Sequence, residues 1–184
     1  LYKKINYGNI EELNSFLKNI SIKFQSVSNS IQDVIINEHK VTEKIRSPEV
    51  SNIVSSIASI GEVREFLVKE QRLIGNRGGI IAEGRDIGSK VFPDAELKIF
   101  LTASIDERAR RRKIELENSG YGNIDLKNLK DQILKRDFND STREISPLIK
   151  AEDSIEIVSD GFDENEIVDK IFGFYLEKIP KELN

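Results

Sequence analysis

The sequence predicts an α/β protein built on a parallel sheet, and three observations support this fold class. Short apolar runs typical of strands alternate with helical patterns over residues 79–175, and such alternation is typical of parallel sheets. The composition, 38% hydrophobic and 33% charged, is that of a globular protein. The length of 184 residues fits one domain.

The first half of the chain predicts two helical segments and a small antiparallel sheet. Apolar residues at helical spacing predict an amphipathic helix over residues 10–18. Alternating residues around a Ser-Asn-Ser turn at 28–30 predict a hairpin or meander over residues 21–42. Ser47 before Pro48 is typical of a helix start, and the helix should pause near Gly61 and resume to about Leu73.

The second half predicts the parallel sheet. Strands are expected at residues 79–82, 96–101 and 154–158, with a loop at 83–95 and helices at 105–118 and about 125–138. Gly120 is suited to end the first of these helices. Asp163 and Glu166 have the spacing of a capping box for a final helix.

Composition also narrows the function. A formal net charge of −4 argues against a general nucleic-acid binder, and the absence of Cys excludes disulfides and thiolate metal sites. The single His39 lies in a polar run and is expected at the surface, so no metal site is predicted.

No apolar run has transmembrane length and no signal peptide is visible, so we expect a cytoplasmic protein without a membrane partner. Because the chain contains no Met and opens on Leu1, we expect a piece of a longer protein.

Glu83-Gly84-Arg85-Asp86 follows the predicted strand 79–82. Ligands of open parallel sheets sit beyond the carboxyl ends of the strands. Gly84 would allow a tight turn or a close approach, Arg85 could hold a phosphate through its guanidinium fork, and Asp86 could accept from an amino group. The alternative is a salt-bridged loop.

A second group lies near the end of the helix predicted from about residue 125. If the helix persists, steps of four and three place five residues on one face: Leu129, Ile133, Arg136, Asp140 and Arg143. An apolar stripe that becomes charged is typical of an element that leaves a core and enters a cleft, although helix ends also fray into solvent. The two arginines with an acid between them favour an anion site.

A third group is the basic run 108–113, with five cations in six positions. Such a run is usually a solvated face or a nucleic-acid patch. With Gly120 and Gly122 just beyond it, the helix could instead be a mobile cover over a polyphosphate. Arginine-rich segments without a histidine base or a nucleophile suit phosphoryl transfer, where catalysis is mainly positioning and charge neutralisation.

From about residue 10 onward the chain resembles bacterial cytidylate kinase, a nucleoside monophosphate kinase. The resemblance is carried by ordered segments: EKIRSPEVSNIVSSIASIGEVREFLVKEQR, GIIAEGRDIGSKVFPDAELKIFLTAS, ERARRR and KRDFNDSTREISPL. It implies a P-loop, three-layer α/β fold in a single domain over residues 1–184. In that fold residues 21–46 would be a small β-rich insert of the monophosphate-binding region, and residues 106–123 a helical lid. The family's first strand and first helix would be missing from this chain.

The resemblance also implies the reaction and the site. A monomeric enzyme would move the γ-phosphoryl group of ATP, with Mg²⁺, to CMP or dCMP, giving CDP or dCDP and ADP. The implied catalytic arginines around the acceptor phosphate are Arg85, Arg136 and Arg143, and Asp140 would bind the sugar hydroxyls. The residues implied to read cytosine are Ser55, Arg64 and Asp86, and those implied to contact ATP are Arg108, Arg111 and Arg112. A carboxylate can accept from the N4 amino group of cytosine, which uracil lacks.

Two departures from the family pattern leave alternatives open. No G-x-x-x-x-G-K-[ST] motif occurs in residues 1–184, and Ser159-Asp160-Gly161-Phe162 stands where the family usually has Asp-Thr or Asp-Ser. The first alternative is a non-catalytic nucleotide-binding protein that lost its P-loop. The second is a binding module that uses the basic run, against which the acidic net charge argues.

Overall fold

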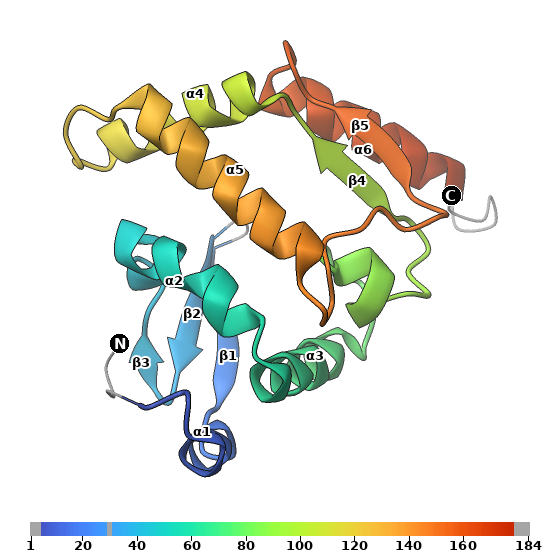
Figure 1. The fold of residues 1–184 in the computed structure, drawn as a ribbon. Coiled ribbons are helices and arrows are strands. Elements are labelled where there is room, and N and C mark those ends of the chain that lie inside the picture. The colour runs from blue at the N-terminus through green and yellow to red at the C-terminus, as the bar shows by residue number, and fades with distance from the viewer. Residues whose placement is uncertain (1–4, 29–30, 179–184) are drawn as a thin grey trace. The chain divides into compact units, whose positions relative to one another are not determined.

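The computed structural model describes residues 5–28 and 31–178 (Figure 1). The chain divides into two compact units, Leu1–Ile81 and Ala82–Asn184, and each is described by itself. The first holds helices and an antiparallel sheet, and the second holds helices and a parallel pair of strands. The predicted α/β class is confirmed.

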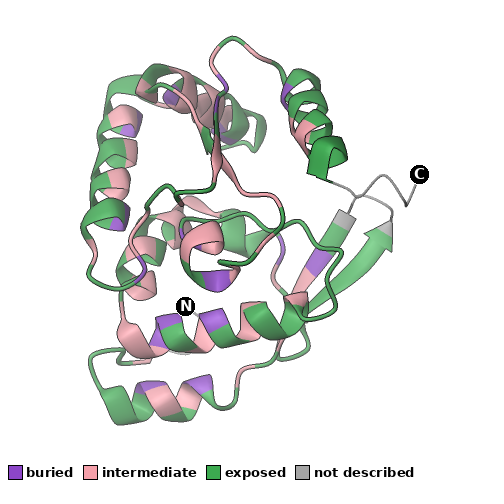
Figure 2. Ribbon diagram, turned by 90° about the vertical axis from the view of Figure 1, so that its right-hand side faces the viewer, coloured by how far each residue is buried: buried purple, intermediate pink, exposed green. Residues whose placement is uncertain are grey.

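Three helices form the core of the first unit: α1 (Ile10–Leu17), α2 (Pro48–Ala58) and α3 (Gly61–Gly75). Leu13 and Leu17 of α1 pack against Val63 of α3, and burying each such side chain stabilises the fold by about 1.5–3 kcal/mol. Ser47 Oγ accepts from Val50 N at 3.3 Å, which confirms the predicted start of α2. The predicted pause near Gly61 is the break between α2 and α3. Buried positions are few along the helices and lie among intermediate and exposed ones (Figure 2).

The small sheet of the first unit confirms the predicted meander. Strands β1 (Ile22–Ser28), β2 (Ile31–Ile36) and β3 (His39–Lys40) pair antiparallel in this order, and the short helix η1 (Lys44–Arg46) follows. Asn29 and Ser30 of the predicted turn lie outside the described residues. Within β2, Asp33 pairs with Lys40 at 2.8 Å and accepts from Thr42 Oγ1 at 3.0 Å. The hydrogen bond from Lys40 is the main cause that lowers the pKa of Asp33.

In the second unit, β4 (Ile99–Thr102) and β5 (Ile155–Val158) pair in parallel, from Ile99 beside Ile155 to Thr102 beside Val158. Their carboxyl ends therefore meet at one edge. The helices of this unit are α4 (Ile105–Asn118), α5 (Leu126–Thr142) and α6 (Glu164–Lys178), and α4 and α5 lie side by side (Figure 1). No helix in the described part of the chain combines the length and the apolar character needed to cross a membrane.

The predicted helix boundaries of the second unit are confirmed at two caps. Gly120, with φ +84°, follows α4, and Tyr121 N donates to Leu116 O at 3.1 Å, which is the hydrogen-bond pattern of a glycine C-cap. At the start of α6, Asp163 N donates to Glu166 Oε2 at 2.8 Å and Glu166 N donates to Asp163 Oδ1 at 2.9 Å. This is the predicted capping box.

Three expectations for the second half of the chain were wrong in extent or type. Residues 79–82 form no strand, because a strand needs a neighbour for its backbone hydrogen bonds and no described segment pairs with this one. The loop expected at 83–95 contains a π-helical turn, η2 (Ile87–Val91). The helix expected to end near residue 138 continues to Thr142.

Candidate anion-binding site

The second unit brings together four of the predicted site residues, with three arginines around the carboxylate of Asp140. Asp140 Oδ2 accepts a hydrogen bond from Arg85 Nε at 3.1 Å. Arg136 Nε lies 3.7 Å from the same oxygen, and Arg143 Nη1 lies 4.0 Å from Asp140 Oδ1. We call these four residues the arginine cluster.

The persistence of α5 explains how this helix provides most of the cluster. Arg136, Asp140 and Arg143 are spaced by four and three residues, so they share one face to the end of the helix. Asp140 is 2% exposed and its backbone carbonyl accepts from Leu148 N at 2.7 Å. Arg143 Nε donates to Ser146 O at 2.6 Å. The carboxylate is therefore held in place by both the helix and the segment that follows it.

Arg85 reaches the cluster from the loop before η2. The backbone carbonyl of Asp86 accepts from Lys90 N at 2.8 Å and from Val91 N at 3.1 Å, and Val91 is buried. A Cβ at Gly84 would lie 2.8 Å from Ile87 Cγ1, a distance that real side chains do not show. Gly84 thus permits a close approach to Ile87 within the turn. This packing sets the position of the backbone from which the Arg85 side chain extends.

The electrostatics of the cluster favour an anion. Three guanidinium groups beside one carboxylate leave a formal charge of about +2. Burial is the main cause that lowers the pKa of Arg136, and the neighbouring Arg85 cation lowers it further. The side chains of Arg85 and Arg136 are 42% and 41% exposed. Excess positive charge therefore reaches solvent, where a phosphate can take charge-assisted hydrogen bonds from the guanidinium forks.

The arginines of the basic run on α4 pair with carboxylates of α4 and α5. Arg108 Nη1 pairs with Asp137 Oδ2 of α5 at 2.5 Å, and Arg112 Nη1 pairs with Glu115 Oε2 at 2.7 Å. Arg111 Nε donates to Glu107 Oε1 at 2.6 Å. The three arginines predicted to contact ATP thus each have a carboxylate partner. Arg112 still acts on the cluster, because its charge contributes to the lowered pKa of Arg136.

Glu107 was not among the predicted site residues, yet its carboxylate holds two arginines of this run. Its carboxylate accepts from Arg110 at 2.8 and 2.7 Å and from Arg111 at 2.6 Å. These hydrogen bonds, with that from Arg110 the largest, lower the pKa of Glu107 to about 2. The i, i+3 and i, i+4 spacing was the available signal.

The remaining predicted residues lie apart in the chain. Asp86 is buried in the second unit. Ser55 lies on α2 and Arg64 on α3, both in the first unit. Arg64 is buried, and its Nη2 donates to Gln71 Oε1 at 3.3 Å. Within residues 5–28 and 31–178, no group of three or more His, Cys, Asp and Glu side chains is arranged to hold a metal ion.

Comparison with known proteins identifies the family of this chain. The model of the cytidylate kinase family matches residues 1–177. The chain therefore belongs to the cytidylate kinase family, and the predicted resemblance is confirmed.

Individual relatives agree with this assignment. The chain is 63% identical over 180 residues to the bifunctional pantoate ligase/cytidylate kinase of Prochlorococcus marinus strain MIT 9312, covering 98% of this chain and 35% of that protein. Identity to the protein of the same description from strain MIT 9215 is 60% over 182 residues, covering 99% of this chain and 36% of the relative. The chain thus spans about a third of the length of these curated relatives.

Proposed function

We propose that the full-length protein carrying this chain transfers the γ-phosphoryl group of ATP to CMP or dCMP, giving CDP or dCDP and ADP. The observation that carries the proposal is the arginine cluster, in which two half-exposed guanidinium groups are held at a buried carboxylate. Membership of the cytidylate kinase family supports it, as does the cytidylate kinase activity in the names of the relatives.

The cluster suits the acceptor phosphate of CMP. Arg85 and Arg136 can donate paired N–H groups to the phosphate oxygens and neutralise them while the acceptor oxygen attacks. Arg143, which is largely buried beside Asp140, adds positive charge next to the carboxylate. Asp140 anchors the guanidinium groups and can accept from the sugar hydroxyls with its remaining lone pairs. Such a site contributes to catalysis by positioning and charge stabilisation.

Base selection is assigned to Asp86, Ser55 and Arg64. A buried carboxylate at Asp86 can accept a hydrogen bond from the N4 amino group of cytosine. Uracil has a carbonyl oxygen at this position, so two hydrogen-bond acceptors would face each other. Hydroxyl and guanidinium donors at Ser55 and Arg64 suit the acceptor edge of the ring.

The donor is MgATP. The Mg²⁺ ion supplies charge neutralisation on the ATP phosphates, and it typically binds those phosphates with one or two carboxylates rather than a dedicated protein cage. In the proposal, residues 106–123 form the lid, and Arg108 and Arg112 face the ATP phosphates from it.

The proposed enzyme is cytoplasmic and monomeric, acts in pyrimidine nucleotide metabolism, and binds neither nucleic acid nor membranes. The net charge of −4 supports the absence of nucleic-acid binding.

A turnover assay tests this function. The full-length protein is mixed with MgATP and either CMP, dCMP or UMP, and ADP formation is followed with coupled enzymes. We expect rapid turnover with CMP and dCMP and little with UMP. Arg136→Lys keeps the charge but loses the fork, so kcat/KM for CMP should fall by about tenfold or more. Lys135→Arg, on the exposed neighbouring position, should behave as wild type.

Two results would contradict the proposal. Tight CMP binding without CMP-dependent ADP formation would identify a non-catalytic nucleotide-binding protein instead. Equal turnover of all three acceptors would remove the assignment of base selection to Asp86, Ser55 and Arg64.

A further inference from the structure

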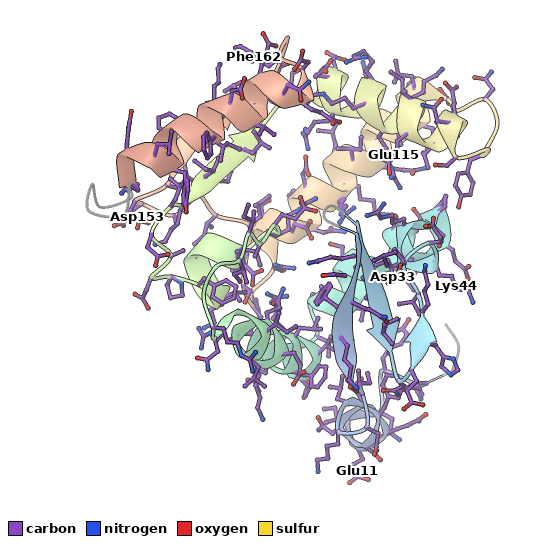
Figure 3. All side chains as sticks on the ribbon, turned by 180° about the vertical axis from the view of Figure 1, so that it is seen from behind. Glu11, Asp33, Lys44, Glu115, Asp153 and Phe162 are labelled. Carbon is purple, nitrogen blue, oxygen red and sulfur yellow. The ribbon has the colours of Figure 1, made fainter. Side chains whose placement is uncertain are left out.

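The loop Ser159–Phe162 follows β5 directly and is folded as a tight turn. Phe162 N donates to Ser159 O at 3.3 Å, and Gly161 has φ +76°. Ser159 is 3% exposed and its hydroxyl donates to Thr102 O, the last residue of β4, at 3.1 Å. Phe162, at the end of the loop, lies just before α6 (Figure 3).

Arg111 binds this loop from α4. Its Nη2 donates to Ser159 O at 2.7 Å and to Phe162 O at 3.3 Å, and its Nη1 donates to Ser159 Oγ at 3.0 Å. The Nε group donates to Glu107, so four of the five N–H groups of the guanidinium are already used within the protein. Arg111 thus bridges both ends of the turn.

A second contact fastens the same loop to the start of α4. Asp160 Oδ2 accepts from Ser104 N at 2.8 Å, and hydrogen bonding to Ser104 is the main cause that lowers the pKa of Asp160. Ser104 also caps α4 by accepting from Glu107 N. The loop is therefore tied to β4, to the cap of α4 and to Arg111.

The position of the loop indicates which ligand it binds. It lies at the carboxyl end of β5, beyond which ligands of open parallel sheets bind. The hydrogen bonds described above join the loop to β4 and α4, whereas the acceptor phosphate is assigned to the arginine cluster, which is formed by α5, the residue that follows it and Arg85. Under the proposed function, we therefore assign the loop to binding of the donor nucleotide, as we assign the proposed lid.

We infer that Arg111 is a positioning residue: it shapes the Ser159–Phe162 loop to receive the donor nucleotide and does not itself bind the ATP phosphates. This inference rests on the proposed function. It assigns to Arg111 a role different from the ATP contact that the family resemblance implied, because Arg111 bridges two backbone carbonyls of the loop.

Steady-state kinetics of the full-length protein test the inference. Arg111→Lys keeps one cation but cannot bridge both ends of the turn. We expect KM for ATP to rise about tenfold, with kcat and KM for CMP changed by less than about twofold. The matched control is Arg110→Lys on the same helix, which also pairs with Glu107 and should leave all three parameters unchanged.

A second variant separates the two roles of Arg111. Ser159→Ala removes one acceptor of the guanidinium without touching any cation, so it should raise KM for ATP in the same direction by a smaller factor. If Arg111 bound phosphate directly, Arg111→Lys would lower kcat and Ser159→Ala would leave KM for ATP unchanged. That pattern would overturn the inference.

Binding measured without turnover keeps this test independent of the proposed function. Titration with a fluorescent ATP analogue gives the donor affinity even if wild type shows no CMP-dependent ADP formation, a result that would contradict the proposed function alone. Equal donor affinity in wild type, Arg111→Lys and Ser159→Ala would overturn the inference alone. If Arg111→Lys loses its thermal unfolding transition, Ser159→Ala decides.

Discussion

Asp140 is the residue on which the candidate site depends. A charge that is 2% exposed is costly unless it is paired, and here it is paired with guanidinium groups from a loop and a helix. The same contacts hold those groups close together despite their mutual repulsion. Their remaining N–H groups are therefore prearranged for a phosphate before any ligand binds.

Asp86 should control base selection. In the full-length protein, Asp86→Ala should weaken CMP binding by about tenfold or more, because a hydrogen bond to a charged group is worth about 1.5–3 kcal/mol. UMP binding should change little, since uracil lacks the N4 donor. Calorimetric titration of both nucleotides measures the difference, and Glu83→Ala, at an exposed position of the same loop, is the control. Equal losses for CMP and UMP would exclude Asp86 from base reading.

Part of the site could be predicted from residue spacing and part could not. Helical periodicity placed Arg136, Asp140 and Arg143 on one face, and the structure confirms this because α5 continues to Thr142. Arg85 is 55 residues from Asp140 in the chain. No local pattern joins them, so only the family resemblance grouped Arg85 with the others.

At the scale of elements, local hydrogen bonds were predictable and pairing between segments was not. The caps at Ser47, Gly120 and Asp163 depend on residues within a turn of one another, and all three are confirmed. The predicted strand 79–82 was wrong because strand formation depends on a distant neighbour. For the same reason the pairing of Arg108 with Asp137, 29 residues away, could not be seen in the basic run.

The ion pairs of α4 predict a pH dependence. The pKa of Glu107 is lowered to about 2 from an ordinary value of 4.5, so its stabilising effect is complete above pH 4.5 and is lost as pH falls toward 2. Glu107→Gln should therefore lower the melting temperature by a constant amount between pH 5 and 7. The gap to wild type should shrink below about pH 4.5.

Thermal melts across a pH series check this. Glu115→Gln, which removes the partner of Arg112 at a more exposed position, should change the melting temperature less at every pH. A gap between wild type and Glu107→Gln that stays constant down to pH 2.5 would show that the two arginines do not stabilise the ionised carboxylate.

At the scale of the whole molecule, a positive site lies on a negative chain. The net charge of −4 disfavours extended polyanions, while the arginine cluster presents about +2 at one point. This combination suits a small phosphate monoester, which carries a charge of about −2 near neutral pH. Membership of the cytidylate kinase family is consistent with a site for a mononucleotide rather than for a nucleic acid.

The most direct test of the account is a calorimetric comparison of CMP with cytidine, which differ by the phosphate alone. In the full-length protein, Arg85→Lys and Arg136→Lys should each weaken CMP binding by about tenfold or more and leave cytidine binding unchanged, while Lys135→Arg changes neither. If the two arginine variants weaken CMP and cytidine by the same factor, or if wild type binds both equally, the arginine cluster is not the phosphate site and the central claim fails.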